Sequence, residues 1–190
     1  MGKNGIRILV VDDDEIVREV ITSLLSGEGY AVQAAKDGLD ALKILKTQDI
    51  NLIITDLRMP GIDGIEVLKE SVKMDPDRAV IILTAYGTLD IALKAIREGA
   101  YDYMTKPFKM EEMIIRVNNA YERTLQVIKE KALVKILREI LSNIMCFKGG
   151  ETNHSRAIID WVDRIEQLEE LEILDKSEAL LIKERLIGEW

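Results

Sequence analysis

The chain has 190 residues, of which 47% are hydrophobic and 32% are charged, and its formal net charge is -8. These values are typical of a globular protein with room for one domain and a smaller appendage, and they exclude a disordered or fibrous chain. The acidic balance argues against a dominant nucleic-acid surface, which would need clustered Lys and Arg. The single cysteine, Cys146, cannot form an internal disulfide, which favours a reducing compartment.

The sequence shows no signal for export or for membrane insertion. The N-terminus lacks the charged and apolar regions of a signal peptide. No apolar run approaches the roughly 20 residues that are needed to span a bilayer. We therefore expect a cytoplasmic protein that has no membrane partner.

Residues 6 to about 120 alternate β-rich runs with segments of helical periodicity, which is typical of a parallel sheet covered by helices on both faces. The predicted strands are 6–11, 31–35, 50–55, 79–83 and 101–104. The predicted helices lie near 15–26, 38–47, 64–74 and 88–98, and a fifth follows Lys106-Pro107. The fold class is therefore α/β, with a five-stranded parallel sheet in the expected order 2-1-3-4-5.

The chain beyond residue 122 predicts an all-helical extension, so that we expect a first domain at 1–122 and a helical region at 123–190. From Glu111 to Phe147 there is no Gly or Pro, and apolar residues recur at helical spacing. The residues of this apolar stripe are Ile114, Val117, Tyr121, Leu125, Ile128, Ala132, Ile136, Ile140 and Ile144. The fifth helix is therefore expected to continue to about 147 as one rod. The apolar stripe of this rod (111–147) either forms a dimer or folds back onto later helices, and the sequence alone does not decide between them.

Two further helices are predicted after the rod. One lies near 154–173, and a shorter one begins with a cap at Asp175 or Ser177 and runs through Leu186. Residues 151–190 contain eleven Asp and Glu against five Lys and Arg, a balance that disfavours a DNA-binding output.

Polar side chains follow four of the predicted strands, where each strand ends. Asp12 and Asp13 follow the first strand, Asp56 the third, Thr84 the fourth and Lys106 the fifth. Because ligands of such sheets bind beyond the carboxyl ends of the strands, where the strand order reverses, we expect these side chains to meet. Clustered carboxylates call for a cation such as Mg²⁺. A carboxylate there can accept a phosphoryl group, whose oxygens a lysine and a hydroxyl would stabilise.

The runs that contain these residues resemble the receiver domain of bacterial two-component response regulators. The resemblance covers about residues 5–122 and implies a flavodoxin-like receiver fold. It also implies a signalling switch that modifies itself and is not an enzyme acting on an outside substrate. The matching runs are Val10-Val11-Asp12-Asp13-Asp14, Asp56-Leu57-Arg58-Met59-Pro60-Gly61-Ile62-Asp63-Gly64, Thr84-Ala85 and Lys106-Pro107-Phe108.

The resemblance implies a chemical role for each strand-end residue. Asp56 would be the phosphoacceptor, charged by a sensor histidine kinase or by small phosphodonors. Asp13 and Asp56 would ligate Mg²⁺ together with the backbone carbonyl of Arg58, while Asp12 would reach the metal through water. Lys106 would pair with the phosphoryl group.

The resemblance also implies how phosphorylation would be read out. Thr84 would move toward the phosphoryl oxygen and Tyr103 would turn inward with it, which would reshape the face made by the fourth helix, fifth strand and fifth helix. The Lys106-Pro107 peptide would be cis, which proline permits. Arg58 and Tyr86 lie where the family tunes the lifetime of the acyl phosphate, and their bulk predicts slow autodephosphorylation.

The helical region leaves the output of the switch open. The leading hypothesis is that it forms a homodimer or docks a protein partner. One alternative is a transcriptional regulator with an atypical DNA-binding output, and another is a regulator of an attached phosphatase or hydrolase. His154, the only histidine, could serve in phosphotransfer or in a metal site, but a polar residue at a helix start is the better interpretation.

Overall fold

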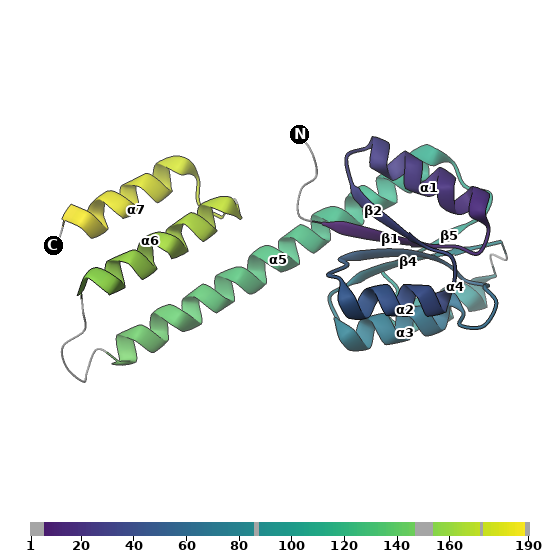
Figure 1. The fold of residues 1–190 in the computed structure, drawn as a ribbon, viewed down its shortest axis with the longest axis horizontal. Helices are drawn as coiled ribbons and strands as arrows, with labels where there is room; N and C mark the ends of the chain where they lie inside the picture. The colour runs from purple at the N-terminus through teal and green to yellow at the C-terminus, as the bar shows by residue number, and fades with distance from the viewer. Residues whose placement is uncertain (1–5, 86–87, 147–153, 172, 189–190) are drawn as a thin grey trace. The chain divides into compact units, whose positions relative to one another are not determined.

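The protein consists of two compact units in the computed structural model, Met1–Thr124 and Leu125–Trp190. The first unit is an α/β domain and the second is helical (Figure 1). The residues that the structure describes are 6–85, 88–146, 154–171 and 173–188.

A five-stranded parallel sheet lies at the centre of the first unit (Figure 1). Its order is β2-β1-β3-β4-β5, which confirms the predicted order. In the ladder, Val11 lies beside Thr55 and Asp56 lies beside Leu83, so the carboxyl ends of the central strands meet at one edge. The strands are β1 (Arg7–Val11), β2 (Ala31–Ala35), β3 (Leu52–Asp56), β4 (Ala79–Thr84) and β5 (Asp102–Thr105).

Helices cover both faces of this sheet, because alternate residues of its apolar strands point to opposite faces. On one face, Ile54 of β3 packs in a buried cluster with Ile21 of α1 and Val117 of α5. On the other face, the neighbouring Ile53 packs in a second cluster with Leu45 of α2 and residues of α3 and α4. The helices are α1 (Glu15–Gly27), α2 (Gly38–Thr47), α3 (Gly64–Met74), α4 (Leu89–Arg97) and α5 (Met110–Cys146).

The largest departure from the predicted strand bounds is at β3, which begins at Leu52 and includes Asp56 instead of covering 50–55. The bounds of β1, β4 and β5 differ from the prediction by one residue at one or both ends, and those of β2 agree with it. Asn51, just before β3, still bonds through its backbone, since its amide donates to the Arg7 carbonyl at 3.0 Å and its carbonyl accepts from the Ala79 amide at 3.2 Å. The Arg7 amide, however, donates to the Asn51 side-chain oxygen at 2.8 Å and not to a strand carbonyl, and the regular pairing begins at Leu52. At the other end, Asp56 still pairs with Leu83 of β4. Asp56 is therefore the last strand residue, held by the sheet itself.

The second unit contains the end of α5 together with α6 (His154–Glu170) and α7 (Lys176–Gly188). Ile136 of α5, Ile165 of α6 and Ala179 of α7 are buried in it. None of the helices in the described ranges is both long enough and apolar enough to cross a membrane.

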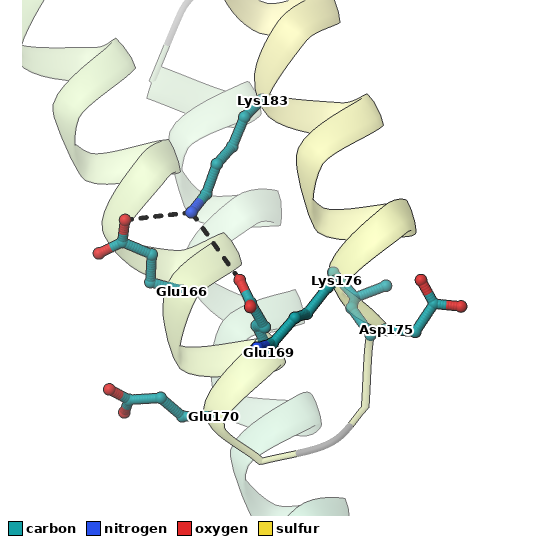
Figure 2. Close-up of a pocket in the computed structure, with 7 residues that line it drawn as sticks. Glu166, Glu169, Glu170, Asp175, Lys176 and Lys183 are labelled. Atoms are coloured by element: carbon teal, nitrogen blue, oxygen red, sulfur yellow. Dashed lines mark hydrogen bonds and ion pairs between the residues drawn. The ribbon is translucent and has the colours of Figure 1, made fainter.

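Ion pairs join α6 and α7 across a surface hollow of about 670 Å³. The Lys183 ammonium of α7 lies 3.1 Å from Glu166 and 4.0 Å from Glu169, both on α6 (Figure 2). At the start of α7, the Asp175 carboxylate accepts hydrogen bonds from the amides of Ser177 and Glu178, so Asp175 is the cap. Lys183 is only 22% exposed, but Glu166 is 57% exposed, and solvent therefore screens this ion pair.

Candidate functional site

A cluster of acidic side chains, called the pocket below, lies where β1 and β3 end, at the point where the strand order reverses. Asp12 follows β1 and Asp56 ends β3, and their side chains are only 1% and 9% exposed. The Nζ atom of Lys106, just beyond β5, lies 2.7 Å from Oδ2 of Asp12 and 2.7 Å from Oδ1 of Asp56. One ammonium thus bridges two buried carboxylates.

Backbone amides orient both carboxylates. The Asp14 amide donates to Oδ1 of Asp12 at 3.0 Å, and the Arg58 amide donates to Oδ2 of Asp56 at 2.8 Å. In each case one oxygen binds an amide two residues further along the chain, and the other oxygen binds Lys106. The two acids are therefore fixed in position by their own loops.

The electrostatic balance of the pocket is negative. Burial raises the pKa of Asp12, and the Lys106 ammonium opposes this shift without cancelling it. Burial alone would lower the pKa of Lys106, but its hydrogen bonds to Asp12 and Asp56 outweigh burial, so that its pKa is raised. Lys106 is therefore protonated at neutral pH. One ammonium thus faces two buried carboxylates, an imbalance that a divalent cation would offset.

The other predicted side chains lie around this pair. The Asp13 side chain is exposed. Thr84 ends β4 with its side chain buried, and its carbonyl accepts a hydrogen bond from the Lys106 amide at 2.7 Å. Tyr103 of β5 packs partly buried against the same cluster as Ile53, and its buried hydroxyl has no hydrogen-bond partner among the described residues.

The remaining residues of the predicted site concern the two loops. The Lys106-Pro107 peptide bond is cis. The Arg58 side chain is exposed next to the pocket. Tyr86, which was assigned a part in the lifetime of the acyl phosphate, lies outside the described residues.

Two glycines that the sequence analysis did not assign to the site hold the loop 57–63 in place. A Cβ atom on Gly64, the first residue of α3, would overlap the carbonyl oxygen of Asp56. A Cβ atom on Gly38, the first residue of α2, would overlap the carbonyl oxygen of Ile62. The sequence signal for these two contacts is the repeated Asp-Gly pair at the start of α2 and of α3. A capping aspartate does not require glycine at the next position, so the glycines indicate a separate constraint.

The predicted metal donors are oxygen atoms, the type of ligand that Mg²⁺ prefers. In the part of the chain that the structure describes, no group of three or more His, Cys, Asp or Glu side chains is arranged to hold a metal ion. Of the predicted metal ligands, the carboxylates of Asp13 and Asp56 and the carbonyl of Arg58 would contact the ion directly, and Asp12 would reach it through water. Mg²⁺ commonly binds one or two carboxylates and completes its shell with waters and phosphate oxygens.

Comparison with known proteins identifies the first unit. Residues 8–118 match the family described as "Response regulator receiver domain". The chain is 38% identical over 124 residues to the transcriptional regulatory protein ZraR of Klebsiella oxytoca, a match that covers 65% of this chain and 28% of ZraR.

Two solved structures share this fold. A response regulator receiver domain protein from Clostridium thermocellum is 37% identical with a TM-score of 0.61, over 65% of this chain and 99% of that one. The beryllofluoride-activated NtrC4 receiver domain dimer is 36% identical with a TM-score of 0.60, over 62% of this chain and 98% of that one. By contrast, the chain spans only 28% to 52% of the length of its first curated relatives. The protein belongs to the response regulator receiver domain family.

Proposed function

We propose that the protein is a two-component response regulator in which Asp56 accepts a phosphoryl group with the help of Mg²⁺. The observation that carries this proposal is the Lys106 ammonium, held 2.7 Å from both Asp12 and Asp56. A lysine in that position can pair with the negatively charged phosphoryl oxygens when the Asp56 carboxylate becomes an acyl phosphate. The chemistry is a modification of the protein itself, so the chain is a switch and not an enzyme with an outside substrate.

Each residue of the pocket then has a defined part in the transfer. An oxygen of Asp56 forms a bond to phosphorus while the bond between phosphorus and the donor atom breaks. The electron pair of the broken bond stays with the donor. Lys106 and the Thr84 hydroxyl contact the phosphoryl oxygens. Asp13, Asp56 and the Arg58 carbonyl would hold Mg²⁺, with Asp12 acting through water. When bound, the metal offsets charge on the transferred group.

We propose a sensor histidine kinase as the donor. An apolar groove of about 480 Å³ adjoins Lys106, between the start of α1 and the segment before α5. Its lining includes exposed Ile16, Val20 and Met110. A protein that brings a phosphohistidine to Asp56 needs a docking surface near the pocket, and this groove supports that requirement.

The proposed output is dimerisation or docking of a protein partner through the helical unit. The helix α5 begins in the first unit and continues to Cys146. Leu180 and Leu181 of α7 are exposed. The solved NtrC4 receiver is described as an activated dimer, which supports a homodimer here. Sedimentation with and without beryllofluoride tests this: a monomer under both conditions contradicts it.

A transcriptional output is the second candidate, because the similar protein ZraR is named a transcriptional regulatory protein. DNA retention that weakens steeply as salt rises would support this reading, since phosphate contacts release counterions. Retention that does not depend on salt would count against it. The acidic balance of residues 151–190 makes the protein-partner output the preferred one.

The phosphoacceptor is tested with wild type and Asp56→Asn, incubated with Mg²⁺ and an acyl phosphate. Intact-mass spectrometry should show a phosphoryl adduct on wild type and none on Asp56→Asn. Asp40→Asn, which changes a carboxylate in the first turn of α2, serves as the matched control and should be phosphorylated like wild type. Equal labelling of Asp56→Asn would refute the assignment.

Arg58 and Tyr86 lead us to expect slow loss of the adduct, so a half-life of seconds would contradict their shielding role.

A further inference from the structure

We infer that Gly38, at the start of α2, is a positioning residue for the metal-binding loop of this site. The inference rests on the proposed function, because it concerns how the loop 57–63 presents the Arg58 carbonyl to Mg²⁺. Gly38 lies on α2, whereas the residues of the pocket lie at strand ends or in the loops that follow them. Its effect is carried by its contact with Ile62, which involves both the backbone oxygen and the side chain of that residue.

The contact joins the first residue of α2 to the end of the loop. A Cβ atom on Gly38 would overlap the backbone oxygen of Ile62 and lie 2.8 Å from its Cβ and Cγ2 atoms. Gly38 is buried, and Ile62 packs against the core cluster beside it. A backbone oxygen cannot rotate away as a side chain does, so any residue larger than glycine must displace either α2 or the loop.

The capping requirements of α2 do not explain glycine at this position. Asp37 caps the helix by accepting a hydrogen bond from the Asp40 amide at 2.7 Å, and this bond uses no property of Gly38. The φ angle of Gly38 is not in the left-handed region, so the backbone does not demand glycine either. Close approach to Ile62 is the remaining physical reason for the missing side chain.

The loop 57–63 is restrained at both ends, so it cannot easily accommodate a displacement of Ile62. Directly after Ile62, Asp63 and Glu66 form a capping box that fixes the start of α3. Gly64, the residue after Asp63, lies so close to the Asp56 carbonyl that a Cβ atom would overlap it. The Gly64 amide donates a hydrogen bond to the Leu57 carbonyl at 3.0 Å. Both ends of the loop are thus tied together, so a shift at one end moves the segment that carries Arg58.

Leu57 and Met59 complete this restraint, because both side chains are buried in the same core cluster as residues of α2 and α3. Arg58 lies between them, and its amide binds Asp56 at 2.8 Å. The orientation of the Arg58 carbonyl therefore depends on a loop that is clamped by α2 at Gly38 and by α3 at Gly64. Groups that orient metal ligands in this way affect metal affinity even though they never touch the ion.

Calorimetric Mg²⁺ titration of the full chain tests the inference with a matched pair of variants. Gly38→Ala should weaken Mg²⁺ binding by about tenfold while the circular dichroism spectrum stays native. Gly27→Ala is the control, because a Cβ atom at the end of α1 would meet nothing within 4 Å. Its Mg²⁺ affinity should equal that of wild type. Raising Mg²⁺ to saturation should restore phosphorylation of Gly38→Ala, which a general loss of structure would not allow.

A second pair keeps the test decisive if Gly38→Ala does not fold. Ile62→Ala removes the side chain against which Gly38 packs, whereas Ile44→Ala truncates a partly buried side chain of α2 on the same core cluster. Ile62→Ala should weaken Mg²⁺ binding more than Ile44→Ala. Unchanged affinity in Gly38→Ala, or equal losses within either pair, would overturn the positioning role while leaving the proposed function intact. Failure of wild type to bind Mg²⁺ would instead overturn the proposed function.

Discussion

Replacing Lys106 by methionine isolates the electrostatic contribution of the bridging ammonium. Methionine keeps most of the aliphatic length but removes the charge, so that Asp12 and Asp56 face each other without compensation. The expected result is a large loss of stability in metal-free buffer. Added Mg²⁺ should restore part of the loss, because the cation would supply the missing positive charge.

The magnitude follows from burial. Both ion pairs of Lys106 are 2.7 Å long, and the two carboxylates are 1% and 9% exposed. Removing one partner of a buried ion pair costs about 3–5 kcal/mol, and because Lys106 itself is 20% exposed we expect the lower value, about 3 kcal/mol. Lys69→Met is the control, since the 3.1 Å pair of Lys69 with Glu98 is 43% and 33% exposed. Exposed pairs of that kind contribute about 0–1 kcal/mol.

Hydrogen exchange of the β1 and β3 amides, followed in urea with EDTA present, reports the unfolding of this unit. Tryptophan fluorescence does not serve, because Trp161 and Trp190 both belong to the second unit. The reasoning fails if Lys106→Met unfolds at the same urea concentration as Lys69→Met. That result would mean that solvent already screens the two carboxylates.

Three further substitutions test other parts of the first unit, each by urea unfolding. Burial raises the pKa of Tyr30 from 10.0 to about 12, and its hydroxyl donates to Asn118 at 2.6 Å. The stability that protonated Tyr30 contributes is complete below pH 10 and is lost as pH rises to about 12, so wild type should lose about 2–3 kcal/mol relative to Tyr30→Phe over that interval. Gly64→Ala places a Cβ atom against the Asp56 carbonyl, so it should lower the free energy of unfolding by about 2 kcal/mol and slow phosphorylation. An unaffected variant would show that the loop can move to accommodate the methyl group. In Arg78→Met, the buried backbone oxygens of Ile50 and Ser71 lose the hydrogen bonds that the guanidinium donates, so the free energy of unfolding should fall by about 2 kcal/mol. Unchanged stability would mean that water replaces the guanidinium.

Much of the fold could be predicted because its signals are local. Apolar runs of strand length alternate with helical periodicity, and Asp37 and Asp63 precede helices that they do cap. The start of β3 was wrong because it depends on a contact that no local pattern encodes. The Asn51 side-chain oxygen, in place of a strand carbonyl, accepts the hydrogen bond of the Arg7 amide, 44 residues away in sequence.

The candidate site divides in the same way. Parallel topology alone is enough to place Asp12, Asp56 and Lys106 at one sheet edge, because all three follow or end strands. What the sequence could not give is the distance between them, which lets one ammonium bridge both acids. Nor could it give the contacts of Gly38 and Gly64, since close approach of two backbones leaves only an absent side chain as its sequence signal.

The apolar stripe of α5 was open to two interpretations, and side-chain burial constrains both. Val117 and Ile136 belong to the stripe and are buried within the single chain. Leu133 and Val134 lie beside the stripe and remain 38% and 46% exposed. A dimer that used the stripe around Ile136 would have to displace packing that already exists, whereas one that used Leu133 and Val134 would not. Because an interface gains free energy only from surface that was exposed beforehand, a partner of this helix is better accommodated by Leu133 and Val134 than by the stripe itself.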